Sequence, residues 1–201
     1  MKLNDALNVV IPVRSDESGA RVHAYHIPIS REVFEANYRH LAATKAHLAG
    51  KGIYYQMDSG PRIAAMVLRD EVRRDAETAG DLDDSGKPSD KAAVALFAEI
   101  KRLTTILAPT ANGWESIPVD RAIQTDAIDR EEWDEALSAL VFFTCHYALG
   151  RKVDRPRIAE ATASLLRASI TSSPLSEYAS SLARSMQAAP SVVKVESSET
   201  P

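Results

Sequence analysis

The stretch over residues 129–149 constrains the fold more than any other part of the chain. It begins with Asp129 and Glu132, whose D-x-x-E spacing is typical of a helix capping box. Apolar residues then recur at helical spacing and include the continuous run Leu140–Phe143. Four consecutive side chains spread around nearly the full circumference of a helix, so one buried face cannot cover them all. Either this helix lies at the centre of a module, or one of its sides is a surface for a partner.

Five further segments carry the apolar spacing and the capping residues of helices. They run from Ser30 to Gly50, from Gly60-Pro61 to near Gly80, through Leu96, Ile100, Leu103 and Leu107 to Pro109, from near Pro156 through Leu166, and from Ser173-Pro174 through Leu182. The prolines at 61 and 174 suit the first turn of a helix. Between the second and third segments, the polar and aperiodic stretch Gly80–Pro88 predicts a mobile loop.

The N-terminal part of the chain predicts a β-hairpin. Val9–Val13 is rich in β-branched residues, residues 16–19 supply turn chemistry, and side chains alternate from Val22 to Ile27. Ile117 precedes a proline, which favours a short extended piece over Trp114–Val119. Together these patterns predict a mainly α fold, a bundle of about six helices with a short N-terminal β-hairpin.

A module boundary is expected near Pro109, because Pro109, Asn112 and Gly113 interrupt the helical pattern. We therefore predict an N-terminal module of the hairpin and three helices over residues 1–108. A C-terminal helical module is predicted over 109–188. The last residues, 189–201, have too little apolar surface to offset the entropy of ordering, so they predict a disordered tail.

Charge and hydropathy exclude several classes of partner. The formal net charge is −4 and the pI is near 5.8, whereas binding to nucleic acid needs a clustered positive field. The longest apolar run, Ala139–Phe143, is far shorter than the ~20 residues that cross a bilayer. Residues 1–13 lack the continuous apolar core of a signal peptide. We expect a cytoplasmic protein that binds neither nucleic acid nor membrane.

The residues that carry chemistry do not form a recognisable site. The five histidines lack the spacing of metal ligands. Cys145 and His146 are adjacent, and neighbours on a helix point roughly 100° apart, so they cannot hydrogen-bond as nucleophile and base. The chain also contains no phosphate-binding glycine loop, no G-x-S-x-G elbow and no H-E-x-x-H helix. We expect a non-enzymatic protein without a metal or cofactor.

Three stretches, none of them catalytic, carry a resemblance to a known family. They are Ile27–Glu35 followed after a helix by Gly60–Asp70, then Glu135–Tyr147, and last Thr171–Leu182. The last stretch is similar to a serine- and threonine-rich ending of the form S-L-x-x-T-E-[FY]-x-x-S-L. In this order the stretches resemble the tail assembly chaperones of long-tailed siphophages. Residues Lys51–Tyr55 have no counterpart in that pattern.

This resemblance implies a protein of the host cytoplasm that is absent from the mature virion. Members of the family bind the long, aggregation-prone tape measure protein, keep it soluble and recruit tail tube subunits. A programmed ribosomal frameshift often gives these proteins a longer minor form. A homo-oligomer is compatible with this reading.

The candidates for partner binding are apolar residues that overfill a single buried face, namely Phe142, Phe143, Leu166 and Tyr178. A chaperone that holds an aggregation-prone client must present apolar surface, so we expect these residues to contribute to client binding as well as to the core. Amphipathic helices would then engage helical client segments. A structural alternative stays open: a virion component, such as a head–tail connector or tail completion protein, that uses the N-terminal hairpin in sheet pairing.

Overall fold

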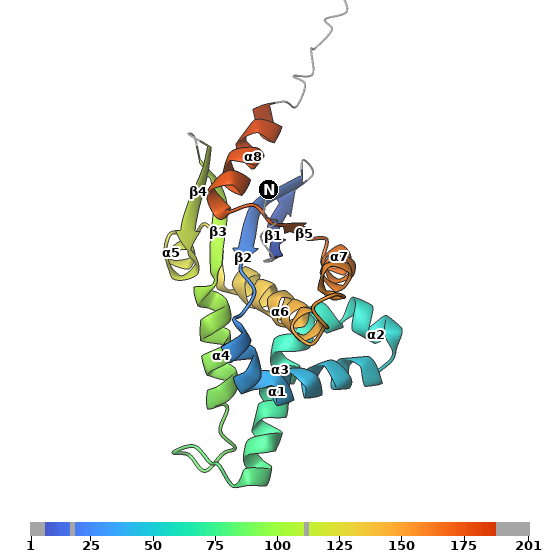
Figure 1. Cartoon of the computed structure of the whole chain (residues 1–201). Coiled ribbons are helices and arrows are strands. Elements are labelled where there is room, and N and C mark those ends of the chain that lie inside the picture. The colour runs from blue at the N-terminus through green and yellow to red at the C-terminus, as the bar shows by residue number, and fades with distance from the viewer. Residues whose placement is uncertain (1–6, 17–18, 111–112, 188–201) are drawn as a thin grey trace, which may run out of the picture.

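The computed structural model describes residues 7–16, 19–110 and 113–187, and all structural statements below concern these residues. Within them the chain forms eight helices and a five-stranded antiparallel sheet (Figure 1). The prediction of a mainly α bundle with a short N-terminal hairpin is therefore wrong. Three further strands join the hairpin, and the fold is α+β.

The sheet is built from three separate segments of the chain. Its strands are β1 (Asn8–Asp16), β2 (Gly19–His26), β3 (Thr104–Thr110), β4 (Gly113–Pro118) and β5 (Ser169–Thr171). Their order is β4-β3-β2-β1-β5, so the predicted hairpin lies inside the sheet. Ile11 lies opposite Ala24, Ala24 opposite Ile106, and Ile106 opposite Ile117. This row is buried, and we call its side of the sheet the inner face.

Helices lie on both faces of the sheet. They are α1 (Arg31–Gly50), α2 (Ile53–Asp58), α3 (Gly60–Ala79), α4 (Lys91–Arg102), α5 (Val119–Gln124), α6 (Arg130–Tyr147), α7 (Arg155–Leu165) and α8 (Leu175–Gln187). Helix α6 contacts β1 on the inner face, and α1, α3, α4 and α7 contact α6 (Figure 1). Helix α8 lies on the other side, the outer face, against Val10, Tyr25 and Leu107.

The predicted capping residues explain where several helices begin and end. The Ser30 hydroxyl accepts a hydrogen bond from the backbone N–H of Val33 and starts α1. Gly80 ends α3 with a left-handed φ of 72°. Asp129 and Glu132 form the predicted capping box of α6, with both reciprocal hydrogen bonds present. These local signals are confirmed.

The third predicted helix is where the fold prediction fails. Its apolar spacing runs through Leu96 and Ile100 to Leu107, but α4 ends at Arg102. The next residues include the β-branched run Thr104–Ile106, which pairs with β2 instead. In the sheet, Ile106 is buried on the inner face and Leu107 on the outer face. The predicted extended piece that follows is confirmed as β4.

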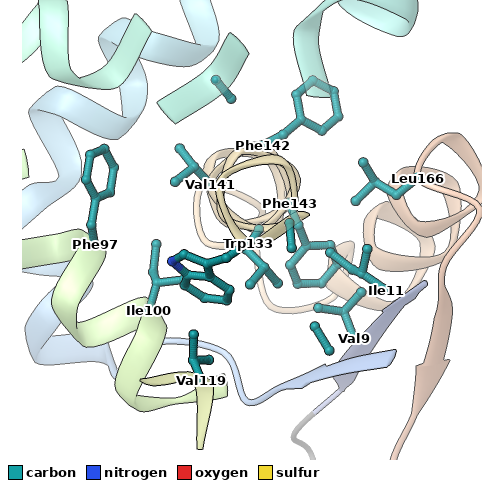
Figure 2. Close-up of a cluster of buried hydrophobic side chains, with 14 of the residues drawn as sticks. Val9, Ile11, Phe97, Ile100, Val119, Trp133, Val141, Phe142, Phe143 and Leu166 are labelled. Carbon is teal, nitrogen blue, oxygen red and sulfur yellow. The ribbon is translucent and has the colours of Figure 1, made fainter. Parts of the chain in front are cut away.

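Helix α6 is the central element of the core. Ten of its 18 residues are buried, which one helix face cannot account for. Figure 2 shows its side chains radiating to different neighbours: Val141 toward Phe97 of α4, and Phe143 toward Ile11 of β1. Phe142 points away from the sheet and lies against Gly60, where an added Cβ would come within 3.0 Å of its ring. All four residues of Leu140–Phe143 are buried, so α6 is a central helix, but of a core that includes residues of 1–108 rather than of the C-terminal module alone.

One hydrophobic core draws on both predicted modules. Its buried cluster contains Leu41 and Leu68 from residues 1–108 together with Trp133 and Phe143 from residues 109–188. The sheet crosses the same boundary, because β1 pairs with β5 and β2 pairs with β3. The division into two modules, 1–108 and 109–188, stays a prediction. The predicted tail, 189–201, lies outside the described residues.

Candidate protein-binding surfaces

The structure places three of the four predicted partner-binding residues in the core. Phe142 and Phe143 are 0% and 1% exposed, and Leu166, which follows α7, is 9% exposed. Tyr178 is half-buried in α8 on the outer face of the sheet. The four residues therefore do not share one surface. Binding through Phe142 or Phe143 stays a prediction, and it would require α6 to separate from its neighbours.

A second, smaller apolar cluster lies on the outer face. Its α8 members are spaced three, four and seven residues from the first, as on one face of an amphipathic helix: Leu175, Tyr178, Ala179 and Leu182. Beneath them lie Val10, Tyr25 and Leu107, with Trp114 at the margin. The Tyr25 hydroxyl donates to the carbonyl of Ser173 (2.8 Å) just before α8. This cluster is separate from the main core.

The largest local group of exposed apolar side chains belongs to α2. Ile53, Tyr54, Tyr55 and Met57 are 61%, 88%, 37% and 46% exposed, and no residue of this helix is buried. We call these four residues the α2 surface. Several exposed apolar side chains on one short helix differ from the scattered single residues of an ordinary surface, and exposed apolar groups of this kind can mark interaction sites.

A hydrogen-bonded histidine links α2 to α6. His146 Nδ1 lies 2.8 Å from the carbonyl oxygen of Phe142, to which it can only donate. Its Nε2 is then the acceptor for the Gln56 side-chain amide at 2.9 Å. Burial lowers the pKa of His146, which favours the neutral ring that this arrangement needs. The hydrogen bond between Gln56 and His146 thus needs a neutral imidazole.

A groove of about 510 Å³ begins beside the α2 surface. Met57, Pro61 and Leu165 contribute apolar walls, and further apolar lining comes from β1 and α6. Charged lining residues of both signs are Asp58, Arg62, Glu132, Glu135 and Arg167. The combination of apolar walls and mixed charge suits an amphipathic segment rather than a small uniformly charged ligand.

A second groove, of about 760 Å³, lies between α3, α4 and α6. Met66, 66% exposed, and Phe97 provide its apolar lining together with smaller side chains. Its charged lining consists of Arg62, Arg69, Arg130, Glu131, Asp134 and Glu135. Arg62 lines both grooves, so the two hollows are neighbours on one side of the molecule.

The groups considered for catalysis are not arranged as a site among the described residues. Cys145 is fully buried, and desolvation raises the pKa of its thiol to about 12, which disfavours the thiolate that a nucleophile needs. No group of three or more His, Cys, Asp and Glu side chains in the described part could hold a metal ion. No described helix is long and apolar enough to cross a membrane.

Sequence reasoning missed the α2 surface. The signal available was the sequence Ile53-Tyr54-Tyr55 between Gly52 and Ser59-Gly60, a short apolar cluster bounded by helix-breaking residues. Gly52 has φ 97°, so the chain turns there between α1 and α2. A six-residue helix is too short for periodicity to show which side is exposed.

Comparison with known proteins gave no relative: no protein-family model, curated protein or solved structure matches the chain.

Proposed function

We propose that the chain is a non-enzymatic tail assembly chaperone, which binds the tape measure protein, keeps it soluble and helps to recruit tail tube subunits. The observation that carries the proposal is the α2 surface, where four large apolar side chains of one six-residue helix are all exposed. The identity of the partner comes from the resemblance of the stretches from Ile27 to Leu182 to tail assembly chaperones.

The composition of the α2 surface supports binding to a protein. Tyrosine combines a large apolar ring with a hydroxyl, and methionine adapts its shape to irregular partners, so both are favoured at interfaces. Fully covering a side chain of this size contributes roughly 1.5–3 kcal/mol through burial alone. Because Tyr54 and Met57 are 88% and 46% exposed, much of this burial free energy would be gained when a partner covers them.

The adjoining groove indicates what part of the client binds. Its apolar walls, Met57 and Leu165, can take the apolar side of an amphipathic helix. Arg62 and Glu135 on the same groove can pair with charged residues along the edges of that helix. Tape measure proteins, as the resemblance implies, are long and aggregation-prone, which is the behaviour expected of exposed amphipathic helices.

The proposed setting is the host cytoplasm, with the protein absent from the mature virion. The net charge of −4 would help to keep a chaperone–client complex soluble by self-repulsion. For the structural alternative, pairing through the N-terminal hairpin is restricted, because β2 has β1 on one side and β3 on the other. Beside β1, strand β5 already pairs with Asn8–Val10.

The proposal is tested by purifying the tagged full chain from infected cells while tails are being assembled. Mass spectrometry should identify the tape measure protein as a major co-purifying component, with tail tube protein in smaller amounts. Purified virions from the same culture should lack the chain. Stoichiometric amounts in virions, without recovered tape measure protein, would favour the head–tail connector or tail completion reading instead.

A further inference from the structure

We propose that the second groove, between α3, α4 and α6, binds an amphipathic helix of a partner protein that carries acidic side chains on one flank and basic side chains on the other. The two helical walls of the groove have opposite charge, and this contrast specifies the pattern of the partner. The proposal rests on the proposed function only in taking the partner to be a protein. Its test uses isolated helices, so it can fail while the proposal for the α2 surface stands.

The wall of the groove that α3 supplies is basic. Arg62, Met66 and Arg69 follow one another at spacings of four and three residues, so they lie on one face of the helix. The Arg69 guanidinium lies over the ring of Phe97, 5.5 Å from its centroid, which places it beside α4. Met66 is 66% exposed between the two arginines. A helix that packs on this wall therefore meets positive charge on either side of an exposed apolar side chain.

The facing wall, from α6, is mainly acidic. Glu131 is followed three and four residues later by Asp134 and Glu135, so the three carboxylates share one face of α6 and line the groove. Arg130, at the start of α6, also lines it. The α6 wall is therefore net negative, whereas the α3 wall is positive.

Most of these charges are available to a partner. Among the described residues, Arg62, Arg130 and the three α6 carboxylates form no ion pair. By contrast, Arg73, farther along α3, pairs with Asp90 at 2.8 Å, and Arg69 lies 3.6 Å from the same carboxylate. A partner with complementary flanks would gain ion pairs on both walls without breaking pairs within the chain. Such pairs at the rim of an interface determine specificity more than affinity.

The floor and the length of the groove favour a helix over a small molecule. Apolar lining comes from Ala65, Phe97 and Leu137. Arg62 and Glu135 line both grooves, so an occupant can extend from the second groove, of about 760 Å³, into the first, of about 510 Å³. An amphipathic helix would place its apolar stripe on the floor and its charged flanks against the walls. Because reversing a helix exchanges its flanks, the walls also select the direction in which it lies.

The test measures the binding of three fluorescently labelled synthetic helices to the full chain, by fluorescence anisotropy at low ionic strength. All three probes carry the same leucine stripe at positions i, i+3, i+4 and i+7. The mixed probe has glutamate on one flank and lysine on the other, and the two uniform probes have lysine on both flanks or glutamate on both. Each uniform probe meets one wall of like charge, so the wild-type chain should bind the mixed probe roughly five-fold or more tightly than either.

Two charge reversals should change this order of affinity. Arg62→Glu removes the net positive charge of the α3 wall, so the probe with lysine on both flanks should bind at least as tightly as the mixed probe. Asp134→Lys should do the same for the probe with glutamate on both flanks. Both residues are exposed, so the fold should be retained, which circular dichroism checks. Arg121→Glu, on exposed α5 surface outside the lining of both grooves, is the control with the same change in net charge and should keep the wild-type order.

A further variant locates the bound helix. Met66→Asp puts a charge beneath the leucine stripe and should weaken binding of the mixed probe roughly ten-fold. Equal affinity of the wild-type chain for all three probes, or no measurable binding of any, would overturn the proposal. So would an Arg121→Glu variant that changes the order as Arg62→Glu does, because net charge rather than the groove would then determine the preference. Unchanged binding of the mixed probe by Met66→Asp would overturn it as well.

Discussion

His26 is a single buried residue that should make the stability of the fold depend on pH. It is fully buried at the end of β2, and its Nδ1 lies 3.0 Å from the Thr104 hydroxyl, which itself donates to the Ile100 carbonyl. The Thr104 oxygen is therefore the acceptor, and the proton of the neutral ring sits on Nδ1. Its Nε2 has no hydrogen-bond partner among the described residues, so a second proton there would be buried without an acceptor. Desolvation accordingly lowers the pKa of His26 to about 3.

This pKa predicts a loss of stability in mild acid. The folded pKa lies below the unfolded value of 6.5, so the contribution is fully present above pH 6.5 and is lost as the pH falls toward 3. The slope should approach about 1.4 kcal/mol per pH unit below pH 6. In His26→Leu the free energy of unfolding between pH 7 and pH 4.5, measured by urea titration, should fall less steeply. An unchanged slope would show that other groups control the acid response.

Arg167 offers a test of backbone strain at one position. It has φ 51° and ends α7, with the backbone N–H of Ala168 bonded to the carbonyl of Ala163, as in a Schellman motif. Glycine adopts this conformation without a Cβ penalty, so Arg167→Gly should raise the free energy of unfolding by up to about 1 kcal/mol. Arg157→Gly, inside the same helix, should lower it by about 1 kcal/mol. Equal destabilisation by both changes would contradict the assigned role of Arg167.

At the scale of elements, substitutions in α6 and in α2 should differ in their effect on stability, because the α6 side chains are buried and the α2 side chains are exposed. Phe143→Ala and Phe142→Ala each remove a buried ring and should cost about 3–5 kcal/mol of stability. Tyr54→Ala on α2 removes a side chain that is 88% exposed, so its effect should stay within about 0.5 kcal/mol. Chemical denaturation of the three variants measures the difference. A small effect of both phenylalanine changes would mean that α6 does not form the centre of the fold.

Comparison of the observed helices and strands with the expected ones shows which elements the sequence could predict. Helices with strong caps, such as α1 at Ser30 and α6 at Asp129, were predicted because capping depends on nearby residues alone. Strand β3 was missed because its apolar residues continue the spacing of α4, and pairing with β2 depends on residues 78 positions away. The three-residue β5 carries no period of its own. Long-range pairing leaves little local trace in a sequence.

The candidate surfaces show the same contrast between features set by nearby residues and features set by long-range packing. Tyr178 was predicted as a binding residue because the apolar residues were expected to overfill a single buried face, whereas in the structure it lies with Leu175, Ala179 and Leu182 on one apolar side of α8. Phe142 and Phe143 were assigned from the overfilled helix, but whether a full circumference is covered depends on what packs around it. The α2 surface was missed because the exposure of its side chains depends on tertiary structure, whereas helix propensity is local. The turn at Gly52 and the hydrogen bond between Gln56 and His146 are two such tertiary features.

At the scale of the whole molecule, the shared core predicts how the chain responds to a protease. All residues from Asp81 to Lys87 are exposed between α3 and α4, so brief digestion with subtilisin should cut there first. The two fragments should elute together in gel filtration, because α3 and α6 meet in one core. Mass spectrometry identifies the cut. First cleavage between Pro109 and Trp114 instead, with fragments that separate, would support two independent modules, 1–108 and 109–188.

The central claim, that the α2 surface binds the client, is tested most directly by co-expressing the chain with its tape measure protein. Tyr54→Asp changes the most exposed residue of that surface. Leu82→Asp is the matched control, because Leu82 is 52% exposed in the loop after α3, about 30 Å from the α2 end of that 20-residue helix. We expect wild type and Leu82→Asp to keep the tape measure protein in the supernatant and Tyr54→Asp to leave most of it in the pellet. Equal solubility with all three chains would contradict the account.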